Sequence, residues 1–111
     1  MKTIKLDIDK KRISLEDVER IDWHIAFFNL DCVDIRVYNS ASGNKHIEID
    51  ILNDVNDYEL VFLQLAMGSD NKRECFNLLR VSSEAFSNQS WNVLFRNKFH
   101  ILLNRKIFKV Q

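Results

Sequence analysis

Two hydrophobic periods alternate along the first half of this 111-residue chain, and they limit the fold more than any other feature. Apolar residues recur at every second position in residues 4–8, 33–38 and 47–51, which predicts short strands with one buried face. Between the first two of these runs, apolar residues recur instead at helical spacing. A chain that mixes the two periods in this order predicts the α+β fold class.

The helical segment has a well-defined start. Ser14 and Asp17 have the spacing of a capping box, and Ile13 and Val18 fit a hydrophobic staple. We predict a helix over residues 15–29 that packs on one face of the sheet. Its apolar stripe consists of Val18, Ile21, Ile25 and Phe28, widened by Trp23, Phe27 and Leu30. The facing strand residues are expected to be Val33, Ile35, Val37, Ile47, Ile49 and Ile51.

The second half of the chain has weaker patterns. Residues 60–67 are almost all apolar, which predicts a central strand covered on both faces and paired with the two preceding strands in an antiparallel meander. Asn71 and Glu74 have the spacing of a helix start. Residues 91–102 fit a helical stripe, but their end also fits a strand that turns into a final strand at 107–110. Both alternatives stay open for this mixed C-terminal part.

Composition agrees with one globular domain over residues 1–111, since 46% of the residues are hydrophobic and 29% are charged. Two glycines and no proline cannot build a glycine-rich phosphate loop. The N-terminus lacks the apolar region of a signal peptide, so we expect a cytoplasmic protein. We expect Cys32 and Cys75 to be buried thiols rather than a disulfide.

Charge is divided unequally between the two halves. Residues 1–60 carry thirteen Asp and Glu against eight Lys and Arg, whereas residues 61–111 carry three against eight. Such a division of charge indicates which partners the protein can attract more than how it folds. It favours a non-enzymatic protein that occludes a basic protein partner with an acidic surface, as an immunity protein neutralises a nuclease-type toxin. An alternative is that the basic tail packs beside the acidic strands within the fold.

The candidate contact residues for such a partner are acids on and after the predicted strands, with two tyrosines as anchors. They are Asp34, Tyr38, Glu48, Asp50, Asp54, Asp57, Tyr58 and Glu59. The oligomeric state, monomer or homodimer, is left undecided.

The acid-free C-terminal segment supports a second interpretation, because cationic grooves with stacking aromatics bind single-stranded nucleic acid. The candidate residues are Arg96, Lys98, Arg105, Lys106 and Lys109, interleaved with Trp91, Phe95, Phe99 and Phe108. A pI near 6.8 is low for a dedicated nucleic-acid binder.

A metal-dependent hydrolase is the third interpretation. Asp34, Glu48 and Asp50 should lie on one side of two adjacent strands, but the acid-x-Lys pair of many nucleases is missing. The simpler expectation is a cross-strand pair between Arg36 and Glu48 or Asp50. The histidines have no metal-ligand spacing, so we expect no metal, cofactor or catalytic residue.

Overall fold

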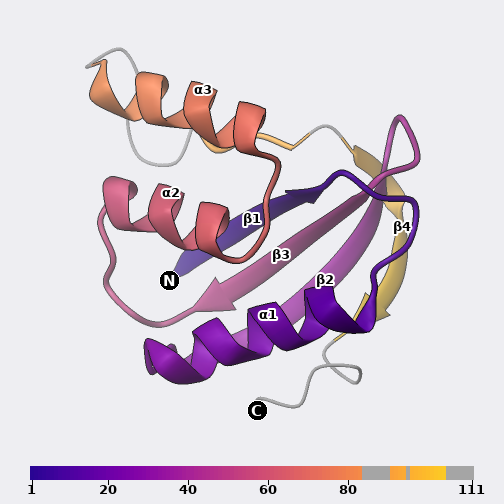
Figure 1. The fold of residues 1–111 in the computed structure, drawn as a ribbon, viewed down its shortest axis with the longest axis horizontal. Helices are drawn as coiled ribbons and strands as arrows, with labels where there is room; N and C mark the ends of the chain where they lie inside the picture. Colours follow the sequence, from indigo (N-terminus) through magenta and orange to yellow (C-terminus); the bar gives the residue numbers. More distant parts are fainter. Residues whose placement is uncertain (84–90, 95, 105–111) are drawn as a thin grey trace.

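The computed structural model describes residues 1–83, 91–94 and 96–104, and it contains both helices and strands (Figure 1). The elements are β1 (Lys2–Ile8), α1 (Leu15–Phe27), β2 (Cys32–Ser40), β3 (Lys45–Ile51), α2 (Asp57–Ala66), α3 (Asn71–Ser82) and β4 (Arg96–Asn104). The α+β class predicted from the two hydrophobic periods is therefore confirmed.

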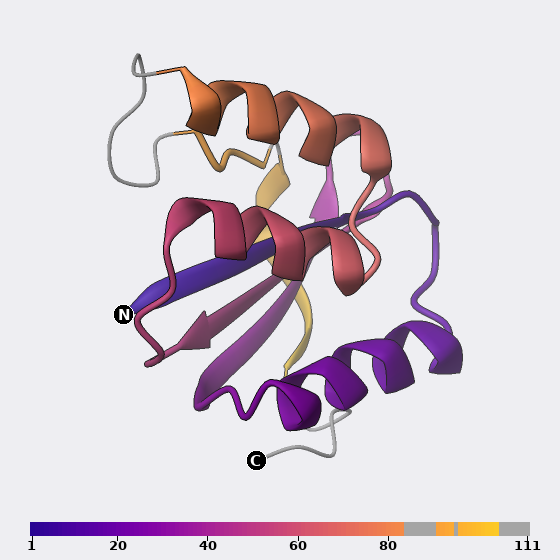
Figure 2. The same ribbon diagram turned by 60° about the vertical axis from the view of Figure 1, so that its left-hand side comes forward.

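The strands form one antiparallel sheet in the order β1-β3-β2-β4. β2 and β3 form the predicted hairpin, and β1 pairs with the far side of β3. Of the two alternatives for the C-terminal part, the structure has the strand, β4, over residues 96–104. The expected strand at 107–110 lies outside the described residues. Helices α1 and α2 cover the same face of the sheet, and α3 lies beside α2 (Figures 1 and 2).

The covered face of the sheet forms the core. The register places Ile4 and Ile35 on either side of Ile49, and all three side chains are fully buried. Ile25 of α1 and Leu60 of α2 are equally buried against this face. Removal of this apolar area from water is the main favourable contribution to folding.

Local hydrogen bonds fix the start of α1 as predicted. The Asp17 amide donates to Ser14 Oγ at 3.2 Å, and the Ser14 amide donates to Asp17 Oδ2 at 2.8 Å. These two bonds are the capping box, and they satisfy amides that a helix start leaves without intrahelical partners.

The end of α1 comes at Phe27, two residues before the predicted end. Asn29 adopts a left-handed backbone with φ of 51°, and the Leu30 amide donates to the Ile25 carbonyl at 2.9 Å. This is the Schellman pattern, which ends a helix with a residue that tolerates positive φ.

The prediction of a central strand over residues 60–67 is wrong, because most of this run belongs to α2. Asn56 and Glu59 form a second capping box, with bonds of 2.8 and 2.9 Å between the side chain of each and the amide of the other. The helix buries Leu63 in the core but leaves Phe62 56% exposed. The strand prediction assumes that a continuous apolar run is buried on both sides, whereas one side of α2 faces outward.

Two smaller expectations also fail. A bulge between Cys32 and Asp34 gives Cys32 the place opposite Ile51, so Val33 turns outward and is exposed. Both described cysteines lack a disulfide, but only Cys32 is buried, and Cys75 is exposed on α3.

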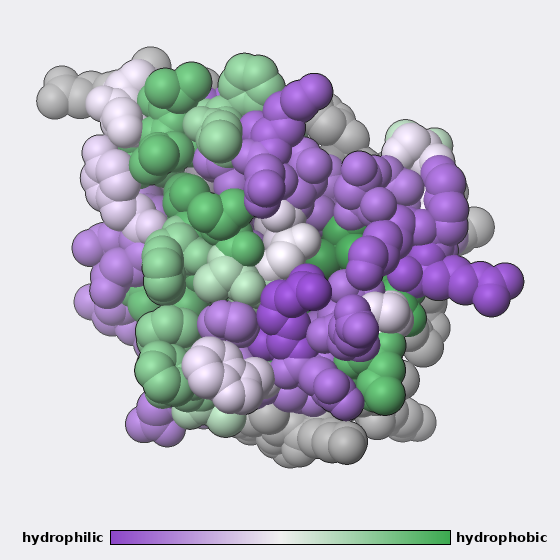
Figure 3. Space-filling model, viewed as in Figure 1, coloured by the Kyte–Doolittle hydropathy of each residue, from purple (hydrophilic) through white to green (hydrophobic). Residues whose placement is uncertain are grey.

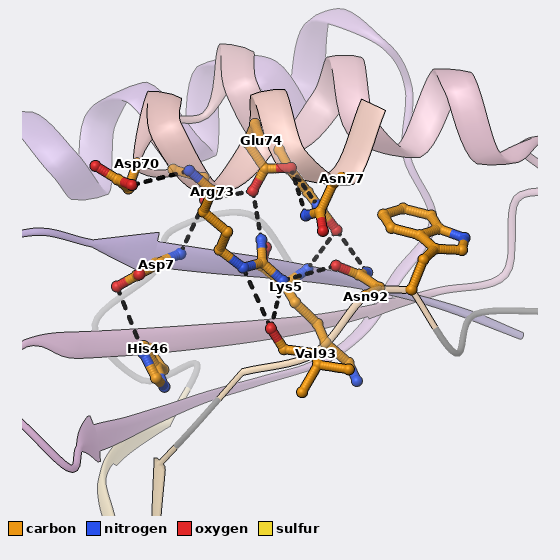
Figure 4. Close-up of polar contacts among 12 residues, drawn as sticks. Lys5, Asp7, His46, Asp70, Arg73, Glu74, Asn77, Asn92 and Val93 are labelled. Carbon is orange, nitrogen blue, oxygen red and sulfur yellow. Dashed lines mark hydrogen bonds and ion pairs between the residues drawn. The ribbon is translucent and has the colours of Figure 1, made fainter. Parts of the chain in front are cut away.

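The outer edge of β1 is covered by side chains from outside the sheet (Figure 4). The Lys5 amide donates to Gln64 Oε1 at 3.0 Å, and the Lys5 carbonyl accepts from Arg73 Nη1 at 3.0 Å. The Thr3 carbonyl accepts from Asn92 Nδ2 at 3.4 Å. These groups take the place of a neighbouring strand, which an edge otherwise leaves open to pairing with other chains.

The connection between α2 and α3 covers the end of the same edge. The Asp7 amide donates to Ser69 Oγ at 3.0 Å, and the Asp7 carbonyl accepts from the Asp70 amide at 2.7 Å. Asp70 also caps α3, since its side chain accepts from the Arg73 amide at 3.0 Å. The predicted helix is present, but its cap is Asp70 rather than Asn71, which is the first residue of α3.

Buried Glu74 joins these groups into one network (Figure 4). Its carboxylate accepts from Gln64 Nε2 at 2.8 Å, Ser69 Oγ at 2.7 Å and Asn77 Nδ2 at 3.1 Å. Its ion pair with Arg73 is largely shielded from water, since the exposed side-chain fractions are 1% for Glu74 and 11% for Arg73. A buried carboxylate is stable only with such partners, so Glu74 and its donors hold α2, α3 and β1 in one arrangement.

Replacing Ile25 with Asp should lower the free energy of unfolding by about 3 kcal/mol or more, because a charge would enter the apolar core without a partner. The matched change at exposed Ala26 should cost far less. Chemical denaturation followed by circular dichroism measures both. A cooperative Ile25→Asp protein as stable as Ala26→Asp would mean that the assigned helix face is wrong.

Replacing Glu74 with Ala should cost about 3–5 kcal/mol, because the largely shielded Arg73 loses its counter-charge and three donors lose their acceptor. Asp70→Asn removes a nearby carboxylate but keeps a capping oxygen, so it should cost less than about 1 kcal/mol. Urea denaturation compares the two variants. Equal losses would show that the network does not stabilise the fold in this way.

Candidate functional site

The acids predicted on the strands lie on the sheet face opposite α1 and α2, and they converge on one arginine. Arg36 Nη1 lies 2.9 Å from Asp34 Oδ2 and 2.6 Å from Asp50 Oδ2, and its Nη2 lies 3.3 Å from Glu48 Oε1. Both expected cross-strand pairs are thus present. Thr3 Oγ1 adds a hydrogen bond of 2.8 Å to Asp50.

This cluster is largely internal. Glu48 and Asp50 are buried, and Asp34 is only partly exposed. Hydrogen bonds from Arg36 hold the pKa of Asp50 below its ordinary value of 3.8, although burial alone would raise it. The same bonds raise the pKa of Arg36 above its usual range. These carboxylates are therefore committed to Arg36 rather than presented to a partner.

The hydrolase interpretation needs carboxylates that surround a cation site. In residues 1–83, 91–94 and 96–104, no three His, Cys, Asp or Glu side chains are grouped so that they could hold a metal ion. Arg36 takes the central position among Asp34, Glu48 and Asp50.

Tyr38, on the same face, is buried and so is not a surface anchor. Next to it, His46 Nε2 lies 3.4 Å from Asp7 Oδ1 (Figure 4).

The other four predicted contact residues lie together between β3 and the first turn of α2. Asp54, Tyr58 and Glu59 are exposed, and Asp57 is half-buried. The capping box described above fixes the Glu59 side chain, because its Oε1 accepts the Asn56 amide. This group is therefore a small acidic surface on the helical side of the molecule.

Four aromatic rings beside these acids form a chain of contacts that the sequence did not predict as a surface. Trp23 and Phe27 stack at 4.7 Å between ring centroids, Phe27 meets Phe28 edge to face at 5.0 Å, and Phe28 meets Phe62 edge to face at 6.0 Å. Their exposed fractions are 57% for Trp23, 64% for Phe27, 36% for Phe28 and 56% for Phe62. We call these four residues the aromatic surface.

The aromatic surface belongs to a wider apolar band. Figure 3 shows apolar side chains running over the three helices along one side of the molecule. Leu65 of α2 and Leu79 of α3 are further exposed large apolar residues of these helices. Contiguous apolar patches of this kind are rare on monomeric proteins and mark interaction sites.

A hollow of about 400 Å³ lies where the aromatic surface meets the acids. Phe28 and Phe62 line it together with buried Leu63, and Asp54 and Glu59 stand at the same hollow. It combines an apolar lining with two carboxylates, and this composition can recognise an amphipathic cationic group.

The sequence pattern predicts all four rings as core residues. Phe28 belongs to the predicted stripe of α1, Trp23 and Phe27 belong to the residues that widen it, and Phe62 lies in the predicted buried strand. The structure contradicts this prediction, because the widened stripe exceeds what one sheet face can cover. The excess width of the stripe is the signal in the sequence that indicates an exposed apolar surface.

The nucleic-acid interpretation falls mostly outside the described residues. Arg96 and Lys98 lie on β4, while Arg105, Lys106 and Lys109 are not among the described residues. β4 pairs with β2, so the part of the basic tail that β4 carries lies beside the acidic strands, as one alternative predicts, and residues 105–111 lie outside the described residues.

Comparisons with protein family models, with curated proteins and with solved structures found no match to this chain. Among the described residues, no helix has the length and apolar character that a membrane span requires.

Acidification should weaken the Arg36 cluster. Because the pKa of Asp50 is lowered in the folded state, its contribution to stability is present above the ordinary carboxyl pKa and is lost as the pH falls through the folded value. The free energy of unfolding should therefore drop between about pH 5 and pH 2, and less steeply in Asp50→Asn. Parallel pH profiles of the two proteins would contradict this role.

Proposed function

We propose that this chain is a non-enzymatic binding protein that occludes the working surface of a basic protein partner, as an immunity protein does to a toxin. The observation that carries the proposal is the aromatic surface, four neighbouring rings that stay exposed in the folded chain. The acids beside it, Asp54, Asp57 and Glu59, supply the charge that selects a basic partner.

Exposed rings support binding for an energetic reason. A large aromatic side chain left in water forgoes the gain of burial, and contact with a partner recovers that gain. Trp and Phe rings also lose little conformational freedom on binding, and Trp is among the residue types that dominate interface energetics. Trp23 and Phe27 are held by stacking, and Phe28 and Phe62 by edge-to-face contact, so the surface is preorganised.

The charges beside the rings favour a cationic partner over a second copy of this chain. Asp54, Asp57 and Glu59 line one open depression. Among the described residues that line it, only Lys2 is basic. Three acids against one base leave this surface negative. Complementary charge speeds encounter and rejects partners of like charge, so self-association through this surface would bring acids together.

This proposal changes where the partner is expected to bind. The sequence predicts contact residues both on the strands and near the start of α2. Asp34, Glu48 and Asp50 are engaged by Arg36, so the acids of the α2 end carry the proposed interface. The proposed partner is still basic, but the proposed contact surface is on the side of the molecule that carries the helices.

Phe27→Ser combined with Phe62→Ser should weaken partner binding by about thirtyfold or more, since each anchoring ring at an interface contributes about 1 kcal/mol or more. The control is Leu15→Ser, an equally exposed apolar residue at the other end of α1. The partner is first captured by crosslinking in a lysate of the source organism and purified. Its affinity for the unchanged chain, the double variant and the Leu15→Ser control is then measured by calorimetry.

The proposal requires a basic partner in one-to-one complex, inhibition of its activity by the chain, and binding lost only in the double variant. Equal binding by the Leu15 control and the double variant would contradict it. So would nucleic acid as the captured component, or a homodimer in light scattering that the double variant dissociates.

A further inference from the structure

We propose that the hollow lined by Phe28 and Phe62 receives an arginine side chain of the partner. This inference rests on the proposed function and specifies the chemistry of its central contact. The hollow has a volume of about 400 Å³, which is ample for one long side chain. The described residues that line it include two carboxylates and no Lys or Arg, so its negative charge has no counter-charge within the hollow.

The aromatic walls suit a flat cation. Phe28 and Phe62 both line the hollow, and they meet edge to face with an interplanar angle of 86° and a centroid separation of 6.0 Å. A guanidinium group can lie over the face of one ring while its methylene stem contacts the other. Buried Leu30 and Leu63 complete an apolar floor for that stem.

The two carboxylates differ in a way that fits a bidentate donor. Glu59 is held in place because its Oε1 accepts the Asn56 amide at 2.9 Å, and that oxygen belongs to the helix cap. Asp54 is exposed and has no hydrogen bond or ion pair to the described residues. Glu59 is thus a rigid acceptor and Asp54 an adjustable one, and together they match the several donors of a guanidinium group.

Arginine fits this site better than lysine. The guanidinium is planar, stacks on rings and is less strongly hydrated than an ammonium group, so less is lost when it enters an apolar hollow. A purely apolar anchor would leave Asp54 and Glu59 at the edge of a dry contact, which is unfavourable for carboxylates.

The test uses the intact chain and three small probes: N-acetyl-arginine methylamide, N-acetyl-lysine methylamide and N-acetyl-norleucine methylamide. Amide NMR signals are followed during titration to about 10 mM, the range where single side chains bind proteins. The arginine probe should shift the signals of Asp54, Glu59 and Phe62. Its affinity should exceed that of the lysine probe by about threefold or more, and that of norleucine by more still.

Two variants and one control sharpen the result. Asp54→Asn and Glu59→Gln should each weaken arginine binding by about threefold, and glutamine keeps the helix cap. Glu16→Gln makes the same charge change in the first turn of α1, at an exposed residue outside the hollow and the proposed interface, so it should leave arginine binding unchanged. Equal binding of all three probes, absence of shifts at these residues, or equal loss in the Glu16 variant would overturn the inference.

These outcomes separate the inference from the function on which it rests. If the probes fail but the partner still depends on Phe27 and Phe62, the aromatic surface binds its partner through another group. If the probes bind as expected but no basic partner depends on these rings, the hollow recognises arginine in some other context and the proposed function fails.

Discussion

The ion pair of buried Glu74 with the largely shielded Arg73 is the interaction on which the rest of the arrangement depends. It lies between α3 and the outer edge of β1, and its partners Gln64 and Ser69 carry the connection into α2 and the following turn. An edge strand that would otherwise invite pairing with other chains is covered by side chains. Because this network fixes α2 relative to the sheet, it also fixes where Phe62 meets the end of α1.

The charged residues of the first half of the chain divide into two groups with different roles. On the sheet face opposite α1 and α2, Arg36 forms ion pairs with Asp34, Glu48 and Asp50 in a cluster that is mostly buried, and its positive charge offsets part of the negative charge of the three acids. At the start of α2, Asp54 and its neighbours are exposed beside the aromatic surface. The proposed binding function uses the second group, while the first stabilises the sheet. An excess of acids in the sequence alone could not distinguish these roles.

Prediction from sequence succeeded where local chemistry decides the structure. The capping box of Ser14 and Asp17 and the alternation around Ile49 are short-range patterns, and both appear as expected. One failure is local, since the run with Phe62 begins at Asn56 and Glu59, which have the capping-box spacing of a helix start, although its apolar composition favours a strand. The other failures lie where tertiary context decides. The bulge that turns Val33 outward depends on the register with β3, which no local pattern encodes. The aromatic surface was missed for the same reason, since exposure is a property of the assembled fold.

Mapping the interface by hydrogen–deuterium exchange of the chain, alone and bound to its purified partner, tests the central claim most directly. The account predicts slower exchange over the C-terminal half of α1 and over residues 53–63, where the aromatic surface and its acids lie. It also predicts unchanged exchange in β2, which carries Arg36 on the opposite face. Protection confined to β2 or to β4, with the end of α1 unaffected, would contradict it.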